Sequence, residues 1–281
     1  MSRIENAFQD ALSRGDGAFI AYVCAGDPDP RFTVEQAVRL SDAGADIIEL
    51  GLPFSDPVAD GSVIQGAMNR ALSGGFATED IFQALRSVRG RNVNRPIVIM
   101  TYYNPILQYG PDKFCKAAAD AGADGLLVVD LPPEESGDLD NLAVSHGLDV
   151  IRLVAPSTSP QRLDEILARA SGFVYAVSVA GTTGARAELS QSAGDLVRRV
   201  LSRTRLPVAL GFGISAPEHV RAALSMGAAG VVEGSGLIAA YSPILSQRSN
   251  ALDCIEHHAR DMKRATLGAC PRLNRHNVDI R

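Results

Sequence analysis

Short apolar segments recur along the chain at regular intervals. They are rich in Val, Ile and Leu, are apolar at nearly every position, and span residues 18–24, 46–51, 96–103, 125–130, 148–154, 173–179, 206–213 and 230–234. Strands of this kind are typical of parallel sheets, in which helices cover both faces. Between them lie segments with helical spacing, several of which end in a glycine that can terminate a helix, as in DAGADIIEL at 42–50. The pattern predicts eight strands that alternate with helices.

Eight such units close naturally into a barrel. We therefore expect residues 1–266 to form one α/β domain, a single (β/α)8 or TIM barrel. The pattern also predicts an extra N-terminal helix at residues 2–14. After the second strand it predicts two helices, at 62–73 and 78–89, where the regular unit has one. An open doubly wound sheet is the alternative, but no GxGxxG motif follows the first strand. Residues 267–281 lack periodicity and are predicted to be a disordered tail.

The composition excludes several classes of protein. With 46% hydrophobic and 21% charged residues, the chain can bury one large core without metals or disulfides. Its net charge of -5 leaves no basic face for a nucleic acid. The cysteines are widely spaced, which argues against disulfides and zinc and favours a reducing compartment: Cys24, Cys115, Cys254 and Cys270. No stretch resembles an export signal or a membrane span. We expect a cytoplasmic protein with no metal or other cofactor and no nucleic-acid or membrane partner.

Two carboxylates lie where a barrel of this kind carries its chemistry, at the C-terminal ends of the strands. Glu49 closes an otherwise apolar strand, where an unpaired carboxylate is costly to bury. It is either a catalytic group or part of a structural hydrogen-bond network. Asp60 follows in the loop LPFSDPVADG, directly before a predicted helix. It is either catalytic or the N-cap of that helix.

Glycine-rich segments follow the last three strands, at 180–186, 211–215 and 233–236. Backbone N–H groups in such turns bind anions, and the loops after strands 7 and 8 hold phosphates in many barrels. Because three of these turns converge on one corner, phosphate binding is favoured over plain turn formation. Glu233, beside this corner, would repel a dianion unless its side chain points away from it.

The positions of lysine and histidine narrow the range of possible reaction mechanisms. A Schiff-base lyase needs a lysine at the barrel mouth, but all three lysines fall in predicted helices: Lys113, Lys116 and Lys263. A metal-assisted cleavage needs clustered ligands, but two histidines fall on helical segments and three in the tail region: His146, His219, His257, His258 and His276. General acid–base chemistry by carboxylates, with a phosphate to supply binding energy, remains.

A set of apolar and aromatic residues is also predicted near the strand C-terminal ends: Tyr22, Met100, Leu127, Val129, Leu153, Tyr175 and Phe212. Any one of them is ordinary barrel core on its own. Together they could enclose a flat aromatic substrate, which a triose site would not need.

Six segments resemble the tryptophan synthase α-subunit family: ELGLPFSDPVADG (49–61), MTYYNPIL (100–107), VVDLPPEE (128–135), SVAGTTGAR (178–186), GFGIS (211–215) and GSG (234–236). The resemblance runs from about residue 5 to about residue 240. It implies that Glu49 and Asp60 are the catalytic pair, with Tyr175 beside them. It also implies backbone phosphate ligands at Gly184, Gly213, Gly234 and Ser235, Thr183 in the indole pocket, and loops 53–60 and 179–192 as closures over the site.

The resemblance implies a carbon–carbon lyase that splits indole-3-glycerol phosphate into indole and glyceraldehyde 3-phosphate by a retro-aldol reaction. Glu49 would move protons, and Asp60 would accept a hydrogen bond from the indole N–H. A β subunit is the implied partner, in an αββα heterotetramer. Three alternatives stay open: a stand-alone lyase without a β subunit, a non-catalytic phosphate-binding or partner-activating barrel, and a phosphosugar isomerase on the same scaffold.

Overall fold

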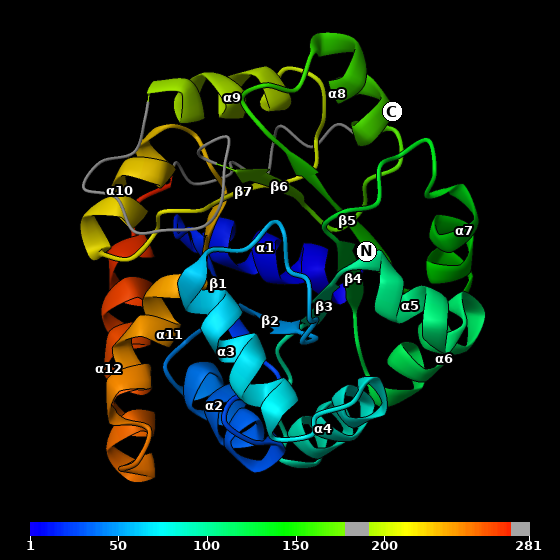
Figure 1. Cartoon of the computed structure of the whole chain (residues 1–281). Coiled ribbons are helices and arrows are strands. Elements are labelled where there is room, and N and C mark those ends of the chain that lie inside the picture. Colours follow the sequence, from blue (N-terminus) through cyan, green and yellow to red (C-terminus); the bar gives the residue numbers. More distant parts are fainter. Residues whose placement is uncertain (178–190, 271–281) are drawn as a thin grey trace.

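The computed structural model describes residues 1–177 and 191–270. In it, eight parallel strands form a closed barrel in chain order, with helices around the outside (Figure 1). The strands are β1 Ala18–Cys24, β2 Ile47–Gly51, β3 Ile97–Thr101, β4 Gly125–Val128, β5 Asp149–Val154, β6 Val174–Val177, β7 Val208–Gly211 and β8 Gly230–Glu233. Each lies within one of the eight predicted segments, and the predicted (β/α)8 barrel is confirmed.

The helices follow the predicted scheme, with two additions. The extra N-terminal helix is α1 Arg3–Arg14, and the two helices after β2 are α3 Ser62–Ser73 and α4 Thr78–Gly90. Two helices also follow β3, α5 Tyr103–Tyr109 and α6 Pro111–Ala121, and this division was not predicted. The remaining described helices that follow the regular scheme are α2 Pro30–Asp42, α7 Gly137–Ser145, α8 Pro160–Leu167, α9 Gln191–Leu201, α10 Pro217–Ser225 and α11 Ser235–Tyr241.

Helix α1 covers the N-terminal end of the barrel. It begins with a capping box, in which the Ser2 hydroxyl accepts a hydrogen bond from the Glu5 N–H at 3.2 Å and the Glu5 carboxylate accepts one from the Ser2 N–H at 2.9 Å. Its buried face includes Phe8, whose ring centroid lies 5.5 Å from that of Phe173, the residue before β6. Helix α1 thus covers the end of the barrel opposite to the predicted site.

A second addition follows β8. A 3-10 turn at Ser242–Ile244 leads into the long helix α12 Arg248–Thr266, which packs against α2, α10 and α11 along one side of the barrel (Figure 1). The next residues stay bound to the barrel, because the Gly268 N–H donates to Asp16 at 2.9 Å and the Cys270 N–H donates to the Gly15 carbonyl at 3.0 Å. The rest of the predicted tail, 271–281, lies outside the described residues.

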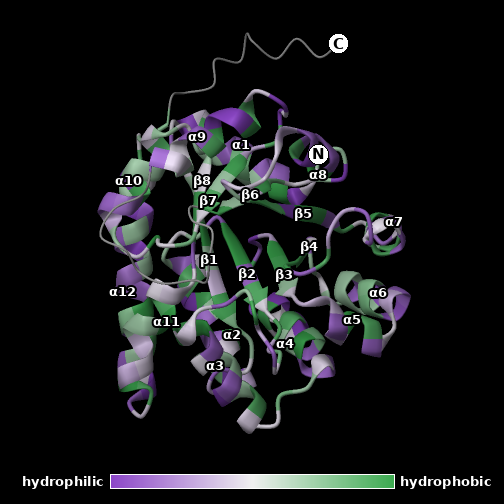
Figure 2. Ribbon diagram, turned by 45° about the horizontal axis from the view of Figure 1, so that its top comes forward, coloured by the Kyte–Doolittle hydropathy of each residue, from purple (hydrophilic) through white to green (hydrophobic). Residues whose placement is uncertain are grey.

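Apolar residues concentrate on the strands, whereas the surrounding helices alternate apolar and polar positions (Figure 2). This is the distribution expected for strands covered on both sides. Within the described ranges, no helix combines the length and the apolarity needed to cross a membrane.

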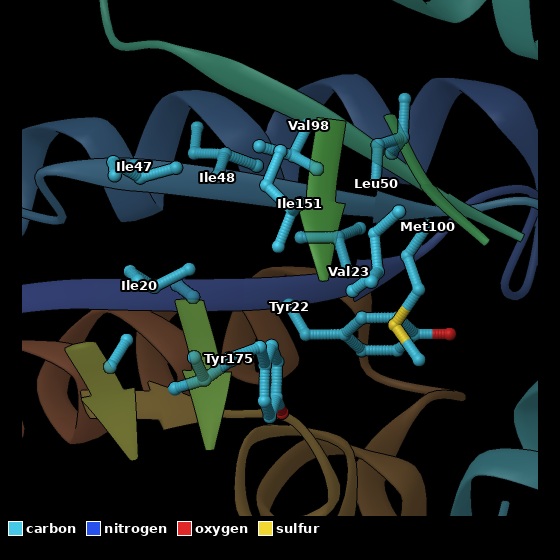
Figure 3. Packing of buried hydrophobic residues seen from close by; sticks show 14 of the residues in the cluster. Ile20, Tyr22, Val23, Ile47, Ile48, Leu50, Val98, Met100, Ile151 and Tyr175 are labelled. Atoms are coloured by element: carbon cyan, nitrogen blue, oxygen red, sulfur yellow. The ribbon is translucent and has the colours of Figure 1, made fainter. Parts of the chain in front are cut away.

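The strand register brings the predicted site residues to one level of the barrel. Tyr22 on β1 lies opposite Glu49 on β2, and Gly51 on β2 lies opposite Met100 on β3. Figure 3 shows Tyr22, Met100 and Tyr175 among the packed strand residues, and all three line one cavity.

Candidate active site

A cavity opens at the C-terminal end of the strands. Its lining consists of Tyr22, Glu49, Asp60, Ile64, Met100, Tyr175, Phe212, Gly213, Ile214, Val232, Gly234 and Ser235. The three predicted catalytic residues, three predicted phosphate ligands and three predicted pocket residues therefore meet in one place. Most of the wall is apolar, which is typical of a site for an aromatic ligand.

Glu49 is fully buried at the base of this cavity. Neither carboxyl oxygen has a hydrogen-bond partner among the described residues, so the structural-network interpretation of this residue has no support there. Burial raises the pKa of Glu49 to about 8, because desolvation disfavours the charged carboxylate. A carboxyl group with a pKa near neutral pH can both donate and accept a proton.

Asp60 is held by a tyrosine that directly follows β3. The Tyr102 hydroxyl donates a hydrogen bond to Asp60 Oδ2 at 2.7 Å and accepts one from the Ala59 N–H at 3.1 Å. Asp60 Oδ1 has no partner within the described part of the chain. Burial raises the pKa of Asp60, and the hydrogen bond from Tyr102 opposes that rise. One carboxylate oxygen is thus fixed, and the other is left for a ligand.

The helix-cap interpretation of Asp60 is wrong. The N-cap of α3 is Gly61, and no side chain caps the helix. The backbone of Asp60 is held instead by Gln65, whose amide donates to the Asp60 carbonyl at 2.8 Å. Its carboxylate lines the cavity.

Two glycines at strand ends make room for the aromatic walls. A Cβ atom on Gly51 would lie 2.2 Å from the Tyr22 hydroxyl, and one on Gly211 would lie 2.3 Å from the Tyr175 hydroxyl. The Tyr175 ring also meets Phe212 edge-on, with ring centroids 6.1 Å apart. Each tyrosine therefore extends over the end of a neighbouring strand, and no larger residue fits beneath it.

The turn after β7 is strained in a way typical of functional sites. Phe212 and Gly213 both have positive φ, 68° and 81°, and a non-glycine residue there is uncommon. Gly213, Gly234 and Ser235 line the same side of the cavity. Convergent backbone of this kind is suited to an anion. Gly184, the fourth predicted phosphate ligand, and Thr183, predicted in the indole pocket, lie outside the described residues, as does most of loop 179–192.

Glu233 points away from the cavity, as phosphate binding requires. Its neighbour Val232 lines the cavity, so Glu233 faces the opposite side of β8, where His258 Nε2 lies 2.6 Å from its Oε1. The prediction that His257 and His258 fall in a tail region is wrong, because both belong to α12.

The sequence comparisons agree with this geometry. A family model described as "Tryptophan synthase alpha chain" matches residues 8–267. The tryptophan synthase alpha chain of Carboxydothermus hydrogenoformans is 49% identical over 238 residues, which cover 85% of this chain and 88% of that protein. The protein of the same name from Methanosarcina acetivorans is 45% identical, over 95% of each chain. The structure of Mycobacterium tuberculosis tryptophan synthase aligns with a TM-score of 0.87 at 35% identity, covering 95% of this chain and 98% of that one.

This chain belongs to the tryptophan synthase α chain family. It is therefore a lyase of tryptophan biosynthesis, and the reaction of its family is the cleavage of indole-3-glycerol phosphate. The family pairs with a β subunit. The resemblance identified from the six motifs is confirmed.

The lysines of this α chain lie away from the cavity. Lys113 and Lys116 belong to α6, and Lys263 on α12 donates to Asp46 at 2.6 Å at the opposite end of β2. Across residues 1–177 and 191–270, no cluster of three or more His, Cys, Asp or Glu residues is arranged to hold a metal ion.

The cavity differs from the predicted pocket at its edges. Leu127 and Leu153 occupy register positions beside Met100 and Tyr175, but neither these leucines nor Val129 line the cavity. Their contact with indole stays a prediction. Sequence reasoning missed Tyr102, although the MTYYNPIL motif contained it. Its position directly after β3, at the catalytic end of the barrel, was the available signal.

Proposed function

We propose that this α chain cleaves indole-3-glycerol phosphate by acid–base catalysis, with Glu49 transferring protons and Asp60 stabilising charge on the indole ring. The proposal is based on the two carboxyl groups in the cavity. Glu49 and Asp60 are buried carboxyls that have oxygens without a hydrogen-bond partner among the described residues, and both line a largely apolar cavity together with Gly213, Gly234 and Ser235. The cavity thus offers apolar side chains for indole, backbone groups for a phosphate and two carboxyl groups.

Glu49 fits the role of a proton shuttle. In the retro-aldol reaction, C3 of the indole gains a proton, and the hydroxyl on the carbon bonded to C3 loses one. The C–C bond then breaks, its electron pair returns to the indole ring, and the hydroxyl carbon becomes the aldehyde of glyceraldehyde 3-phosphate. With a pKa of about 8, Glu49 is mostly protonated at neutral pH and can donate to C3. The resulting carboxylate can take the hydroxyl proton, which restores the starting state.

Asp60 fits the role of an electrostatic stabiliser. Protonation at C3 places positive charge on the ring nitrogen, which is absent in the ground state. A carboxylate oxygen that accepts a hydrogen bond from the indole N–H therefore binds the transition state more tightly than the substrate. Tyr102 fixes Oδ2 and leaves Oδ1 for this contact.

The walls of the cavity supply binding. Four side chains of the lining are proposed to pack against the flat indole ring: Tyr22, Met100, Tyr175 and Phe212. We propose that Tyr175 acts beside the two carboxyl groups. Backbone groups of Gly213, Gly234 and Ser235 are proposed to hold the phosphate, together with Gly184.

We also propose that the catalytic face binds a β subunit, within an αββα heterotetramer. Loop 53–60 and the stretch 102–110 flank the cavity and carry exposed apolar side chains, since Val58 is 77% exposed and Leu107 is 54% exposed. Pro53 and Pro57 limit the conformations of the first loop. Exposed apolar groups beside a site that releases an apolar product fit direct transfer to a partner. Free thiols fit our proposal that the complex acts in the cytoplasm.

An indole-release assay with and without a tryptophan synthase β subunit tests this function. Strong stimulation by the β subunit would show that this chain acts as its subunit. High activity without the β subunit would favour a stand-alone lyase. No indole under either condition would contradict the proposal and leave a non-catalytic barrel or a phosphosugar isomerase.

A further inference from the structure

Glu233 is a buried acid directly behind the proposed phosphate site. It is the last residue of β8, is 0% exposed, and precedes Gly234 and Ser235, which line the cavity. Its Oε1 lies 2.6 Å from His258 Nε2 on α12, and its Oε2 has no hydrogen-bond partner among the described residues. A buried carboxylate is costly unless a counter-charge accompanies it. His258 is that counter-charge.

The surrounding backbone is shaped around this carboxylate. A Cβ atom on Gly236 would lie 2.3 Å from Glu233 Oε1 and 3.1 Å from the Cα of Ser215. The carboxylate therefore fills a space between the turn at 233–236 and the turn at 211–215. These same two turns carry Gly213, Gly234 and Ser235. A change of charge on Glu233 is consequently felt by both backbone segments of the proposed phosphate corner.

The groups that face the pair come from two helices. From α12, His258 and Asp261 act on it, and from α10, His219 does. The His219 Nδ1 accepts a hydrogen bond from the Ser215 N–H at 3.3 Å, so this ring lies against the same turn. Burial raises the pKa of Glu233, and the hydrogen bond with His258 opposes the rise. The hydrogen bond with Glu233 raises the pKa of His258, although burial opposes it.

Because His258 Nε2 and Glu233 Oε1 lie 2.6 Å apart and the contact raises the pKa of His258, the pair holds one shared proton to a higher pH than a free histidine does. Its net charge is then zero, whichever of the two groups carries the proton. When the pH rises through the raised pKa of His258, the proton is lost and a single negative charge remains behind the phosphate corner.

We propose that Glu233 and His258 set the charge behind the phosphate corner, and that loss of their shared proton weakens binding of phosphate-bearing substrate. The inference rests on the proposed position of the phosphate. Neither Glu233 nor His258 lines the cavity, so they act as positioning residues. Their effect falls on KM and on phosphate affinity, and kcat is unchanged.

The test compares variants across pH. In the unmodified chain, KM for indole-3-glycerol phosphate and the inhibition constant for inorganic phosphate should rise on the order of tenfold between pH 6.5 and 9, whereas kcat should follow the titration of Glu49 alone. Glu233→Gln keeps the shape but removes the negative charge. In this variant, the only rise that should remain is the part caused by ionisation of the phosphate itself. His258→Gln should move this rise to the pH at which Glu233 ionises without its partner. His257→Gln, on the exposed side of the same helix, is the matched control and should behave like the unmodified chain.

A measurement without any substitution gives an independent check. If the proton on the pair favours phosphate binding, then phosphate must raise the pKa of His258 by linkage. A nuclear magnetic resonance titration of the histidine rings, with and without inorganic phosphate, should show this for His258 and not for His257. An unchanged His258 titration on saturation with phosphate, or a Glu233→Gln pH profile identical to that of the unmodified chain, would overturn the inference. If inorganic phosphate does not compete with substrate at any pH, the proposed phosphate site itself is wrong.

Discussion

Replacing Tyr102 with phenylalanine removes a single oxygen atom from the site and keeps the ring. That oxygen donates to Asp60 Oδ2 at 2.7 Å and accepts from the Ala59 N–H at 3.1 Å. Without it, both carboxyl oxygens of Asp60 are buried and lack a partner from the described residues. A hydrogen bond to a charged group contributes about 1.5–3 kcal/mol. We therefore expect kcat/KM for indole release to fall by roughly 10- to 100-fold.

The pH dependence distinguishes this effect from simple loss of packing. The hydrogen bond from Tyr102 lowers the pKa of Asp60 against the effect of burial, so its removal raises that pKa further. The ionised form of Asp60 is then lost at a higher pH than before. The defect of Tyr102→Phe should consequently be largest at low pH and should lessen as the pH rises.

Tyr241→Phe is a matched control. The Tyr241 hydroxyl donates to the buried Asp27 carboxylate at 2.6 Å, outside the cavity lining. Its loss should reduce the free energy of unfolding by an amount similar to that for Tyr102→Phe, while kcat/KM stays normal. Steady-state kinetics from pH 6 to 9 and denaturant unfolding should be measured on both variants. A Tyr102→Phe enzyme with a normal kcat/KM profile would show that the hydroxyl is only structural.

Three further substitutions test other parts of the site. Asp60→Asn should lower kcat by at least about 100-fold, from a lost stabilisation of a few kcal/mol, while thermal stability is kept because Gly61 is the N-cap of α3; near-normal turnover would return Asp60 to a structural role. Gly213→Val, at a φ of 81°, should raise KM and the inhibition constant of inorganic phosphate together, and unchanged phosphate affinity would place the phosphate elsewhere. Leu107→Asp should weaken the complex with a β subunit in sedimentation, whereas unaltered binding would move the interface away from this stretch.

The barrel could be predicted because its signal is local. Strands that are apolar at nearly every position, with helices between them, need no information about distant contacts. The division of the segment after β3 into α5 and α6 depends on Gly110, whose φ is 95°, followed by Pro111. Helix α12 was predicted only around Lys263 and not over its full length, although its buried residues recur at helical spacing: Ala251, Leu252, Ile255, Ala259 and Met262. Its segment lies beyond the six motifs that resemble the family.

The site was predicted less completely, because side-chain direction depends on distant partners. The sequence could not distinguish a catalytic Asp60 from a helix cap, since the deciding contact comes from Tyr102, far along the chain. The pairing of Glu233 with His258 likewise requires the packing of α12 against the barrel. Gly51 and Gly211 look like ordinary strand ends in the sequence. Their role as spaces beneath two tyrosine rings emerges only from the strand register.

The central claim is that a buried Glu49 moves the protons of the reaction, and Glu49→Gln tests it most directly. Glutamine keeps the shape but cannot exchange a proton, so indole release should fall by about 100-fold or more, with substrate binding largely retained. In the unmodified chain, kcat/KM should decline above about pH 8, where Glu49 loses the proton that C3 requires.

Stability should change in the opposite direction to activity. Because the pKa of Glu49 is raised in the folded state, the folded chain holds this proton where the unfolded chain has released it. The free energy of unfolding therefore declines as the pH rises from the ordinary carboxyl pKa toward about 8. Glutamine avoids this penalty and should stabilise the fold at neutral pH by about a few kcal/mol. The deciding measurement is indole release by Glu49→Gln in parallel with its unfolding free energy at pH 7. Our account predicts a stable, inactive enzyme, and near-normal indole release from that variant would contradict it.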